Sequence, residues 1–222
     1  MNLLIISCTP RIKEKSNTDK ILDEFKKGYE SVGNTTETLY LSKRNEWEII
    51  RNKFYENDNI LFALPLYVEC IPGIMMEFLE TLEPKQNANT KIGFLLQGGF
   101  AEASQLRCCE EYLENLPSLL ECEYNGTLLK GDMFAVSLID GKIRKQMVEP
   151  FYKMGQYYAQ NNYFNKEVVN DFAKPEYFSK KVIFINNMLS PLKKIFFKLF
   201  AKKLGCRKSL TDKPYQKYVV KM

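Results

Sequence analysis

The sequence predicts an α/β protein built on a doubly wound parallel sheet with helices on both faces. Segments typical of strands alternate with segments typical of helices over residues 1–165. The first strand candidate, Asn2–Ser7, is a continuous apolar run, as expected for a parallel strand that is buried on both faces. Short loops join the segments, and such alternation implies right-handed β-α-β crossovers.

Each element has a recognisable signal. The first helix has an N-cap candidate at Ser16, apolar residues at helical spacing, and Gly33 as its end. Pro65 closes the third strand, Pro72 opens the third helix, and Pro150 marks a start or a kink in the last one. The predicted strands are residues 2–7, 36–41, 58–64, 90–96 and 122–129. The predicted helices run from Ser16 to Gly33 and then over residues 46–55, 73–82, 106–116 and 143–160.

The alternation stops after residue 165, so we expect one domain over residues 1–165 and a basic helical extension over 166–222. In the extension, residues 176–188 and 189–204 read as helices, and 211–222 as a tail. Residues 187–222 contain ten Lys and Arg and one acid, a formal charge of +9, whereas the rest of the chain has −4. A mildly acidic body is thus joined to a strongly basic end.

Composition narrows the function. The chain has 222 residues, 45% apolar, with a formal charge of +5, which is ordinary for a globular protein with one substantial core. The absence of His excludes Ser–His and Cys–His hydrolases and His-liganded metal enzymes. Six cysteines without a CxxC motif argue against a zinc site and for buried thiols, and we expect no metal. The apolar run at residues 3–6 is too short for a signal peptide, and the expected location is the cytoplasm.

Ligands of open parallel sheets bind at the carboxyl ends of the strands, so the loops after strands one, three and four are the candidate site. The first loop, residues 7–18, is rich in hydroxyls, contains Arg11, and leads into a helix N-terminus. Backbone N–H groups and the helix dipole there suit a phosphate monoester. The alternative is a plain capped helix, since neither GxGxxG nor a Walker A motif is present.

The other two loops suit a flat ring. Residues 65–73 have prolines at both ends and Tyr67 inside, so the loop can form a stiff wall, although Tyr67 could simply pack on the sheet edge. The pair Gly98 and Gly99 lets backbone N–H groups approach a ligand closely. The position of three such loops at one sheet edge is the stronger signal.

These residues also resemble a known family. Cys8-Thr-Pro-Arg11 followed by Ser16-Asn-Thr18 resembles the GSPR…SNT phosphate loop of the flavodoxin-like NAD(P)H-dependent FMN reductases. Leu64-Pro-Leu-Tyr67 with Ile71-Pro-Gly73 resembles their SPVYW…MPG flavin loop, and Gln97-Gly-Gly-Phe100 their GG turn. The resemblance spans about residues 1–160 in order and implies a flavodoxin-like sheet of strand order 2-1-3-4-5.

The resemblance further implies one FMN per protomer, a homodimer, and transfer of hydride from NAD(P)H to a small acceptor such as a quinone, nitro compound or flavin. By matching position, the FMN phosphate would be held by Thr9, Arg11, Ser16, Asn17 and Thr18. The isoalloxazine would be lined by Pro65, Leu66, Tyr67, Val68, Gly98, Gly99 and Phe100. No catalytic side chain is assigned, because the cofactor supplies the redox chemistry. This sequence departs from the family at Cys8, Leu64, Val68 and Glu69, and a carboxylate near the flavin would disfavour the anionic hydroquinone.

Two other functions compete with this one. The chain could be an electron-transfer flavoprotein without a nicotinamide site, or a non-catalytic module that associates with a membrane or a protein. The basic C-terminal end has two interpretations of its own. In one it packs on its own domain or on a dimer mate. In the other, residues 189–204 make weak contact with an anionic membrane surface. Nucleic-acid binding is not expected, because the positive charge is local and no reader motif occurs.

Overall fold

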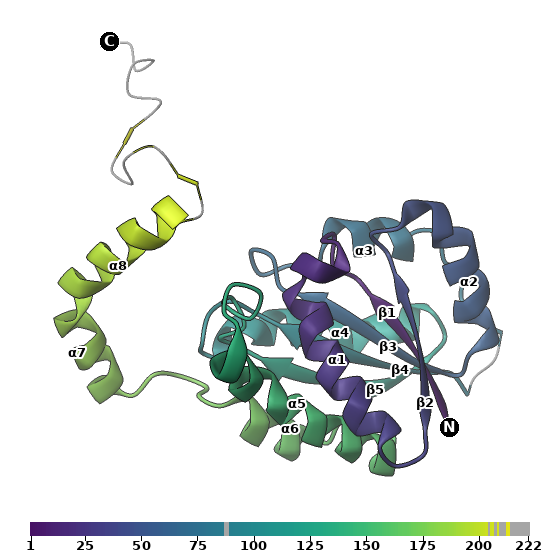
Figure 1. Ribbon diagram of the computed structural model, residues 1–222. Coiled ribbons are helices and arrows are strands. Elements are labelled where there is room, and N and C mark those ends of the chain that lie inside the picture. Colours follow the sequence, from purple (N-terminus) through teal and green to yellow (C-terminus); the bar gives the residue numbers. More distant parts are fainter. Residues whose placement is uncertain (87–88, 204, 207, 209–211, 214–222) are drawn as a thin grey trace, which may run out of the picture. The chain divides into compact units, whose positions relative to one another are not determined.

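The computed structural model describes residues 1–86, 89–203, 205–206, 208 and 212–213. The chain divides into two units, Met1–Tyr177 and Phe178–Met222, and each is described separately. The first unit contains the whole sheet (Figure 1).

All five strands of the sheet are parallel, and they lie in the order β2-β1-β3-β4-β5. This confirms the predicted fold class and strand order. The strands are β1 (Asn2–Ser7), β2 (Thr35–Tyr40), β3 (Asn59–Pro65), β4 (Lys91–Gln97) and β5 (Glu123–Lys130). The three central strands β1, β3 and β4 are buried along most of their length because helices cover both faces.

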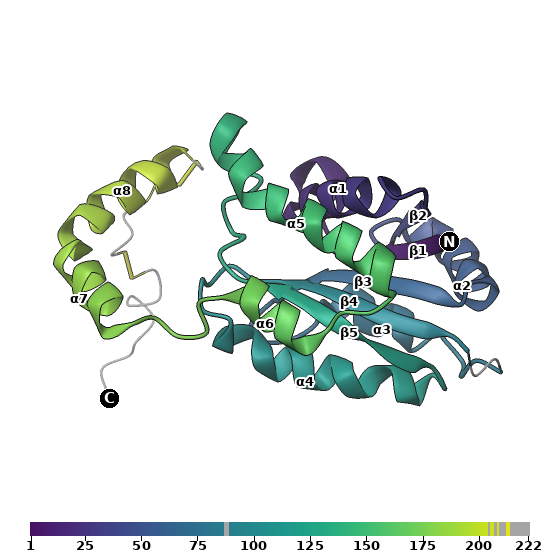
Figure 2. The same cartoon turned by 90° about the horizontal axis from the view of Figure 1, so that it is seen from below.

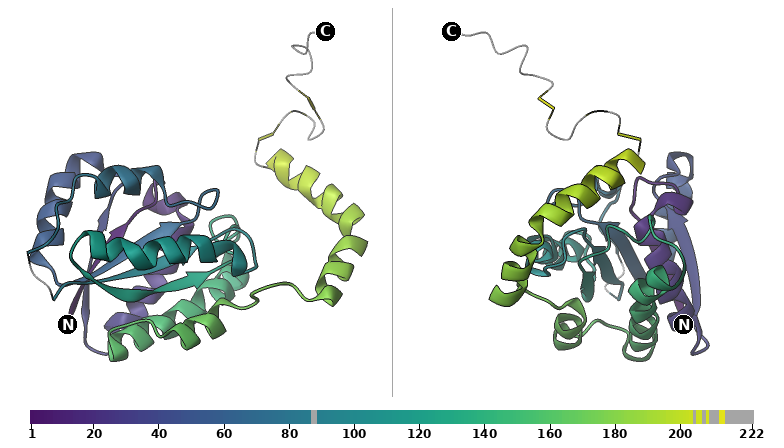
Figure 3. Two further views of the ribbon diagram at one scale, coloured as in Figure 1. Left: turned by 180° about the vertical axis from the view of Figure 1, so that it is seen from behind. Right: turned by 60° about the vertical axis from the view of Figure 1, so that its left-hand side comes forward.

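Helices α1 and α5 lie on one face of the sheet, and α3 and α4 lie on the other (Figure 2). In Figure 3, seen from behind, α4 crosses the sheet as a teal helix. The helices of the first unit are α1 (Asn17–Glu30), α2 (Trp47–Glu56), α3 (Gly73–Leu79), α4 (Ser104–Leu119), α5 (Gly141–Asn161) and α6 (Lys166–Ala173). Short 3-10 turns, η1 (Lys13–Lys15) and η2 (Arg44–Glu46), precede α1 and α2.

The two faces of the sheet are packed differently. On one face α1 and α5 cross so closely that a Cβ added to Gly28 would lie 1.9 Å from the carbonyl oxygen of Tyr152. On the other face a row of aromatic rings continues from α2 across three strands. The row consists of Phe54, Phe62, Phe94 and Tyr124, with neighbouring ring centroids 6.0–6.4 Å apart. Close backbone packing on one side and interlocking rings on the other fix the sheet between its two helical layers.

Several boundaries differ from the sequence predictions. The sequence predicts that β3 ends at Leu64, but Pro65 is still paired, with Gln97 of β4. A proline can occupy this last position because it lacks only the N–H donor and keeps its carbonyl. Helix α6 was not predicted, and it lies against β5 in the first unit, so the division of the chain falls after Tyr177 rather than after residue 165. The helix predicted to start at residue 176 begins at Lys180, because Glu176 is held by α4.

The second unit contains two helices, α7 (Lys180–Met188) and α8 (Ser190–Lys203). Ser179 caps α7 by accepting the N–H of Val182, at 3.3 Å. The Nζ of Lys193 donates to Oδ1 of Asn186 at 2.7 Å, which joins the two helices. The predicted helix end at Leu204 and most of the predicted tail lie outside the described residues.

Candidate functional site at the carboxyl edge of the sheet

The loops after β1, β3 and β4 begin side by side. The backbone N–H of Cys8 donates to the carbonyl of Ala63 at 2.8 Å, so the first loop leaves the sheet beside the end of β3. The N–H of Leu66 donates to the carbonyl of Gln97 at 2.7 Å, which places the second loop beside the end of β4. The structure therefore brings together the three loops that sequence reasoning selected.

Three hydroxyl groups of the first loop already accept one hydrogen bond each. Thr9 accepts the N–H two residues further on at 3.2 Å, and Ser16 accepts the N–H three residues further on at 3.1 Å. Thr18 accepts from the side-chain amide of Gln97 at 3.2 Å. Because a hydroxyl can accept and donate at the same time, Thr9 and Thr18 each retain an O–H donor, whereas the Ser16 hydroxyl is turned to the carboxylate of Asp19. These contacts fix the three oxygen atoms in place.

The start of α1 also has free backbone donors. Among the hydrogen bonds of the described residues, the N–H groups of Asn17 and Thr18 have no acceptor, as is usual for the first turn of a helix. Arg11 is exposed and forms no ion pair within the described chain. Free N–H groups, the positive end of a helix dipole and an unpaired guanidinium are together the features of an anion site.

The side-chain amide of Asn17 has two partners within the chain. Its Nδ2 donates to the carbonyl of Phe134 at 3.1 Å, and its Oδ1 accepts the N–H of Ser137 at 2.8 Å. The amide thus fastens the first loop to the loop that follows β5. The backbone N–H of Asn17 and the second N–H of its side-chain amide are left to meet a ligand.

This loop after β5 is a part of the edge that the sequence reasoning missed. The N–H of Met133 donates to the carbonyl of Gly98 at 2.9 Å, and the N–H of Asp132 donates to the carbonyl of Phe100 at 2.8 Å. Residues 131–140 therefore brace both the phosphate-type loop and the Gly-Gly turn. The only available signal was the Gly131-Asp132 pair directly after a strand.

A buried carboxylate lies under the first loop. Asp19 is 2% exposed, its Oδ1 accepts the hydroxyl of Ser7 at 2.7 Å, and its Oδ2 has no hydrogen-bond partner. Burial raises the pKa of Asp19, while the hydrogen bonds from Ser7 and Ser16 lower it. Burial, and to a lesser extent the Asp19 charge, also raises the pKa of the neighbouring Cys8 thiol well above its ordinary range. Cys8 is thus an inert buried thiol beneath the loop.

The second loop is a tight two-residue turn. Tyr67 and Cys70 exchange both backbone hydrogen bonds, at 3.0 and 3.1 Å. Between them Val68 and Glu69 have φ of 49° and 63°, in the left-handed region that side chains other than glycine avoid. Pro65 is buried and Leu66 is half-buried, whereas Tyr67 and Val68 are 38% and 98% exposed. The loop presents an aromatic and an apolar side chain outward from the sheet edge.

The third loop also presents an aromatic ring to solvent. Gly98 is buried, Gly99 is exposed, and Phe100 is 73% exposed. Tyr67, Val68 and Phe100 thus expose apolar surface on loops that leave two adjacent strands. The edge therefore combines an anion site at α1 with apolar walls on the next two loops, which fits a ligand that joins a flat ring to a phosphate.

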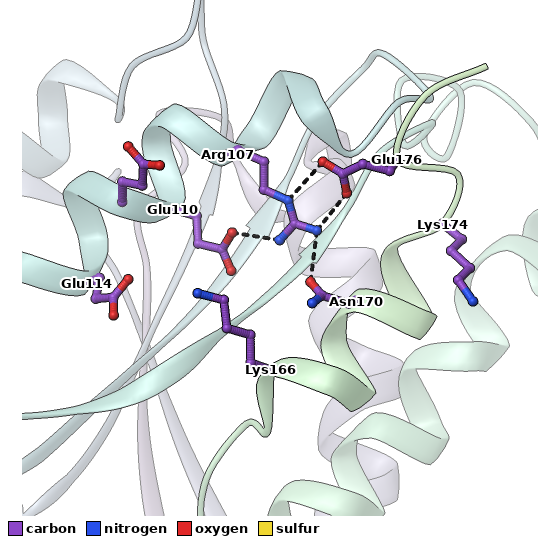
Figure 4. A pocket seen from close by; sticks show the side chains of 8 residues that line it. Arg107, Glu110, Glu114, Lys166, Asn170, Lys174 and Glu176 are labelled. Carbon is purple, nitrogen blue, oxygen red and sulfur yellow. Dashed lines mark hydrogen bonds and ion pairs between the residues drawn. The ribbon is translucent and has the colours of Figure 1, made fainter. Parts of the chain in front are cut away.

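A cavity of about 490 Å³ lies elsewhere, between α4 and α6 (Figure 4). Arg107 is its central residue: its Nη2 and Nε donate to the two carboxylate oxygens of Glu176 at 2.7 and 3.2 Å. Nη1 donates to Glu110 at 2.7 Å, and Nη2 also donates to Oδ1 of Asn170 at 2.9 Å. The hydrogen bonds to Glu176, and then those to Glu110, raise the pKa of Arg107.

This cavity is better explained as a structural clasp than as a ligand site. Its lining consists of charged side chains of both signs and one amide, with no apolar wall for a ring: Arg107, Glu110, Glu111, Glu114, Lys166, Asn170, Lys174 and Glu176. The same segment caps α4, because the carbonyls of Pro175 and Glu176 accept the N–H groups of Ala103 and Ser104, at 2.9 and 3.2 Å. The guanidinium thus fixes residues 174–176 against the start of α4.

Comparison with known proteins identifies the fold and no more. No protein-family model and no curated protein matches the sequence. Among solved structures, an FMN-dependent NADH-azoreductase from Bacillus anthracis in complex with FMN is 13% identical, with a TM-score of 0.56 over 73% of this chain and 99% of that chain. An NAD(P)H:quinone oxidoreductase from Methanothermobacter marburgensis is 14% identical, with a TM-score of 0.56 over 73% of this chain and 98% of that one.

A third structure covers more of the chain. RosB, with a bound 8-demethyl-8-formylriboflavin-5'-phosphate intermediate, is 17% identical, with a TM-score of 0.55 over 86% of this chain and 87% of that one. At these identities the likeness establishes a flavodoxin-like fold. The azoreductase and RosB are described with a bound flavin phosphate, and the candidate edge of this chain has donors for such a ligand.

Proposed function

We propose that this protein is an FMN-dependent oxidoreductase that passes electrons from NAD(P)H to a small acceptor such as a quinone, nitro compound or flavin. The observation on which the proposal depends is the set of unoccupied donors at the start of α1. Two free N–H groups, the hydroxyls of Thr9 and Thr18 and the Arg11 guanidinium lie where the loops with Tyr67 and Phe100 leave the sheet. The bound flavin phosphates in the descriptions of two structural neighbours support the same cofactor, and the description of a third as an NAD(P)H:quinone oxidoreductase supports the same reaction class.

In this proposal the residues of the chain bind and orient the cofactor. Thr9 and Thr18 donate their hydroxyl protons to the phosphate, Ser16 caps the helix whose N–H groups face it, and Arg11 neutralises part of its charge. Tyr67 and Phe100 belong to the walls beside the ring and limit the access of water to it. FMN, when bound, supplies the two-electron redox chemistry itself. No histidine or other proton donor needs to be placed at the site.

The direct test is an absorption spectrum of the purified protein, followed by anaerobic mixing with NADH or NADPH in a stopped-flow instrument. We expect a flavin band near 450 nm that bleaches when the reduced nicotinamide is added. A protein that stays colourless after reconstitution with FMN would refute flavin binding. A flavin band that NAD(P)H does not bleach would favour the electron-transfer flavoprotein instead.

Arg11→Ala tests the position of the phosphate. A charge-assisted hydrogen bond contributes about 1.5–3 kcal/mol, so FMN affinity should fall roughly 10- to 150-fold when measured by fluorescence quenching. Lys13→Ala is the matched control, since it removes one positive charge from the same loop, but its ammonium is already paired with Asp23 at 3.6 Å. Equal losses for the two variants would mean that Arg11 acts only through the net charge.

The resemblance also implies a homodimer, which stays a prediction. Light scattering of the flavin-loaded protein measures the mass directly, and a monomer at micromolar concentration would contradict it.

A further inference from the structure

The helical pair α7–α8 has an unusual charge composition. Residues 178–203 contain seven lysines and neither Asp nor Glu. The 45 residues from Phe178 to Met222 contain twelve Lys and Arg and a single acid, Asp212, whereas residues 1–177 contain 20 basic and 26 acidic residues. An acid-free stretch of this length cannot neutralise its own lysines through the i,i+4 ion pairs that surface helices commonly form.

The same helices expose an unusual amount of apolar surface. No described residue between Phe178 and Lys202 is buried. Eleven large apolar side chains in the pair are between 39% and 68% exposed: Val182, Ile183, Phe184, Ile185, Met188, Leu189, Leu192, Ile195, Phe196, Phe197 and Leu199. Contiguous apolar surface on this scale marks an interaction site, whereas single exposed apolar residues do not.

In α8 most apolar and basic residues separate onto different sides; the exceptions are Phe197, which falls among the lysines, and Lys203, which falls on the apolar side. At 100° per residue, five apolar residues fall within an arc about 140° wide: Leu192, Ile195, Phe196, Leu199 and Phe200. The rings of Phe196 and Phe200 stack one turn apart, with centroids 6.0 Å apart and planes 12° apart. Lys193, Lys194, Lys198 and Lys202 lie outside this arc, and all four are exposed. Aromatic and aliphatic side chains on one side with lysines around them are the pattern of a helix that lies at a membrane interface.

We propose that α7–α8 binds the surface of a bilayer that contains anionic lipids, with the apolar face of α8 among the acyl chains and its lysines at the headgroups. Charge complementarity favours this occupant over two others: a second copy of the pair would bring seven lysines against seven more, and a neutral bilayer would leave the lysines without counter-charges. Residues 1–177, with 26 acidic and 20 basic residues, are the competing partner, and a chain that ends after Tyr177 tests it by its stability. Within the described residues, no helix is both long and apolar enough to cross a membrane. In this proposal the pair lies in the plane of the interface.

Two attractions act together in this association: burial of the apolar face and attraction of the lysines to the anionic headgroups. The lysine stems extend along the apolar layer while their ammonium groups reach the phosphates. Each lysine near an anionic surface strengthens binding about fivefold, and the attraction weakens as salt screens it. Membrane binding by α7–α8 does not depend on whether the protein binds FMN or on which acceptor it reduces.

The test is flotation of the full chain with vesicles of phosphatidylcholine alone and of phosphatidylcholine with 30% phosphatidylglycerol, at 50 and 500 mM salt. We expect the chain to float with the anionic vesicles at low salt, and to remain in solution with neutral vesicles or at high salt. Lys194→Gln, Lys198→Gln and Lys202→Gln together should weaken the binding about a hundredfold. The control replaces three exposed lysines of α5 by Gln, at Lys142, Lys145 and Lys153, and should bind as the parent does.

A second variant tests the apolar face. Phe196→Ser with Leu199→Ser keeps every charge, and it should also abolish flotation, since lysines alone hold a short helix only weakly. Equal flotation with neutral and anionic vesicles, or none with either, would overturn the proposal. A dimer that dissociates when residues 178–222 are removed, without vesicle binding by the full chain, would identify a second copy as the occupant and would likewise overturn it.

Discussion

At the scale of single residues, the carboxylate of Asp19 is subject to two opposing effects. Asp19 is the third residue of α1, where the helix dipole stabilises its negative charge by about 0.3–1 kcal/mol. Burial of a polar group without its hydrogen bonds, however, costs about 1–3 kcal/mol. The Oδ2 atom has no partner, and Asp23 adds a further repulsion that Lys13 only partly offsets. The larger effect is the burial, so the neutral form of Asp19 suits the folded state better than the anion.

We therefore expect Asp19→Asn to stabilise the protein at pH 8 by about 1–2 kcal/mol, measured from urea unfolding midpoints. Because the folded-state pKa of Asp19 is raised, its protonation stabilises the parent fully below the unfolded pKa, and this stability is lost as the pH rises through the folded pKa. The advantage of the variant should hence shrink toward pH 4. Asp23→Asn, at a half-exposed ion pair, is the control and should change stability by less than about 0.5 kcal/mol at either pH. A less stable variant at pH 8 would mean that the helix dipole outweighs burial.

The turn at Val68 and Glu69 is a second residue-scale conflict, and it lies in the candidate site. A two-residue turn with both φ angles positive favours Asn-Gly, whereas each L side chain in this region costs about 1–2 kcal/mol. Val68→Asn with Glu69→Gly should stabilise the protein by about 1–3 kcal/mol, because Val68 is 98% exposed and no packing is lost. Val32→Asn, at an exposed valine without a positive φ, should change stability little. If both variants shift the urea midpoint equally, the effect is one of polarity and not of backbone conformation.

At the scale of elements, the crossing of α1 and α5 is the tightest contact of the fold. A Cβ at Gly28 would lie 1.9 Å from the Tyr152 carbonyl oxygen, and one at Gly155 would lie 2.0 Å from that of Phe25. Both obstacles are backbone atoms, so the helices themselves must separate. Gly28→Ala should destabilise the protein by about 2–3 kcal/mol or prevent its folding. Gly73→Ala, the first residue of α3 with nothing within 4 Å, should be neutral or slightly stabilising, since it removes only a flexible glycine. Thermal unfolding followed by circular dichroism distinguishes the two.

The sequence was sufficient for the elements whose pattern is local. The apolar run of β1 predicts the strand to the residue, and the Ser16 cap and Gly33 predict the ends of α1 to within a few residues. Helix α6 was missed because eight residues give too short a pattern to recognise. The sequence pattern predicts a helix from residue 176, but Glu176 is not helical because it bonds Arg107, which lies 69 residues away in the chain. Periodicity contains no information on such a contact.

For the candidate site too, the sequence predicts the position of the loops but not their long-range contacts. Parallel strands end at one edge, so the three loops could be predicted to meet there, and they do so. What the residues contact could not be predicted: the amide of Asn17 bonds a loop about 120 residues later, and Thr18 accepts from Gln97. The assignment of these residues to FMN stays a prediction. The donors open to a phosphate are their free backbone N–H groups, the hydroxyls of Thr9 and Thr18 and the second N–H of the Asn17 amide.

At the scale of the whole molecule, the two units have opposite formal charges and unequal cores. Residues 1–177 have a formal charge of −6 and contain every buried apolar residue of the described chain, whereas 178–222 have +11 and bury none of their described residues. Stability follows the apolar area removed from water, so it resides in the first unit.

A chain that ends after Tyr177 should unfold in urea with the midpoint and slope of the full chain, since the slope scales with the surface exposed on unfolding. The truncated chain should also bind an anion exchanger at pH 7, where the full chain, at +5, binds a cation exchanger. A midpoint lowered by more than about 1 kcal/mol of stability would show that α7–α8 packs on the body, and its apolar face would then not be available to a membrane.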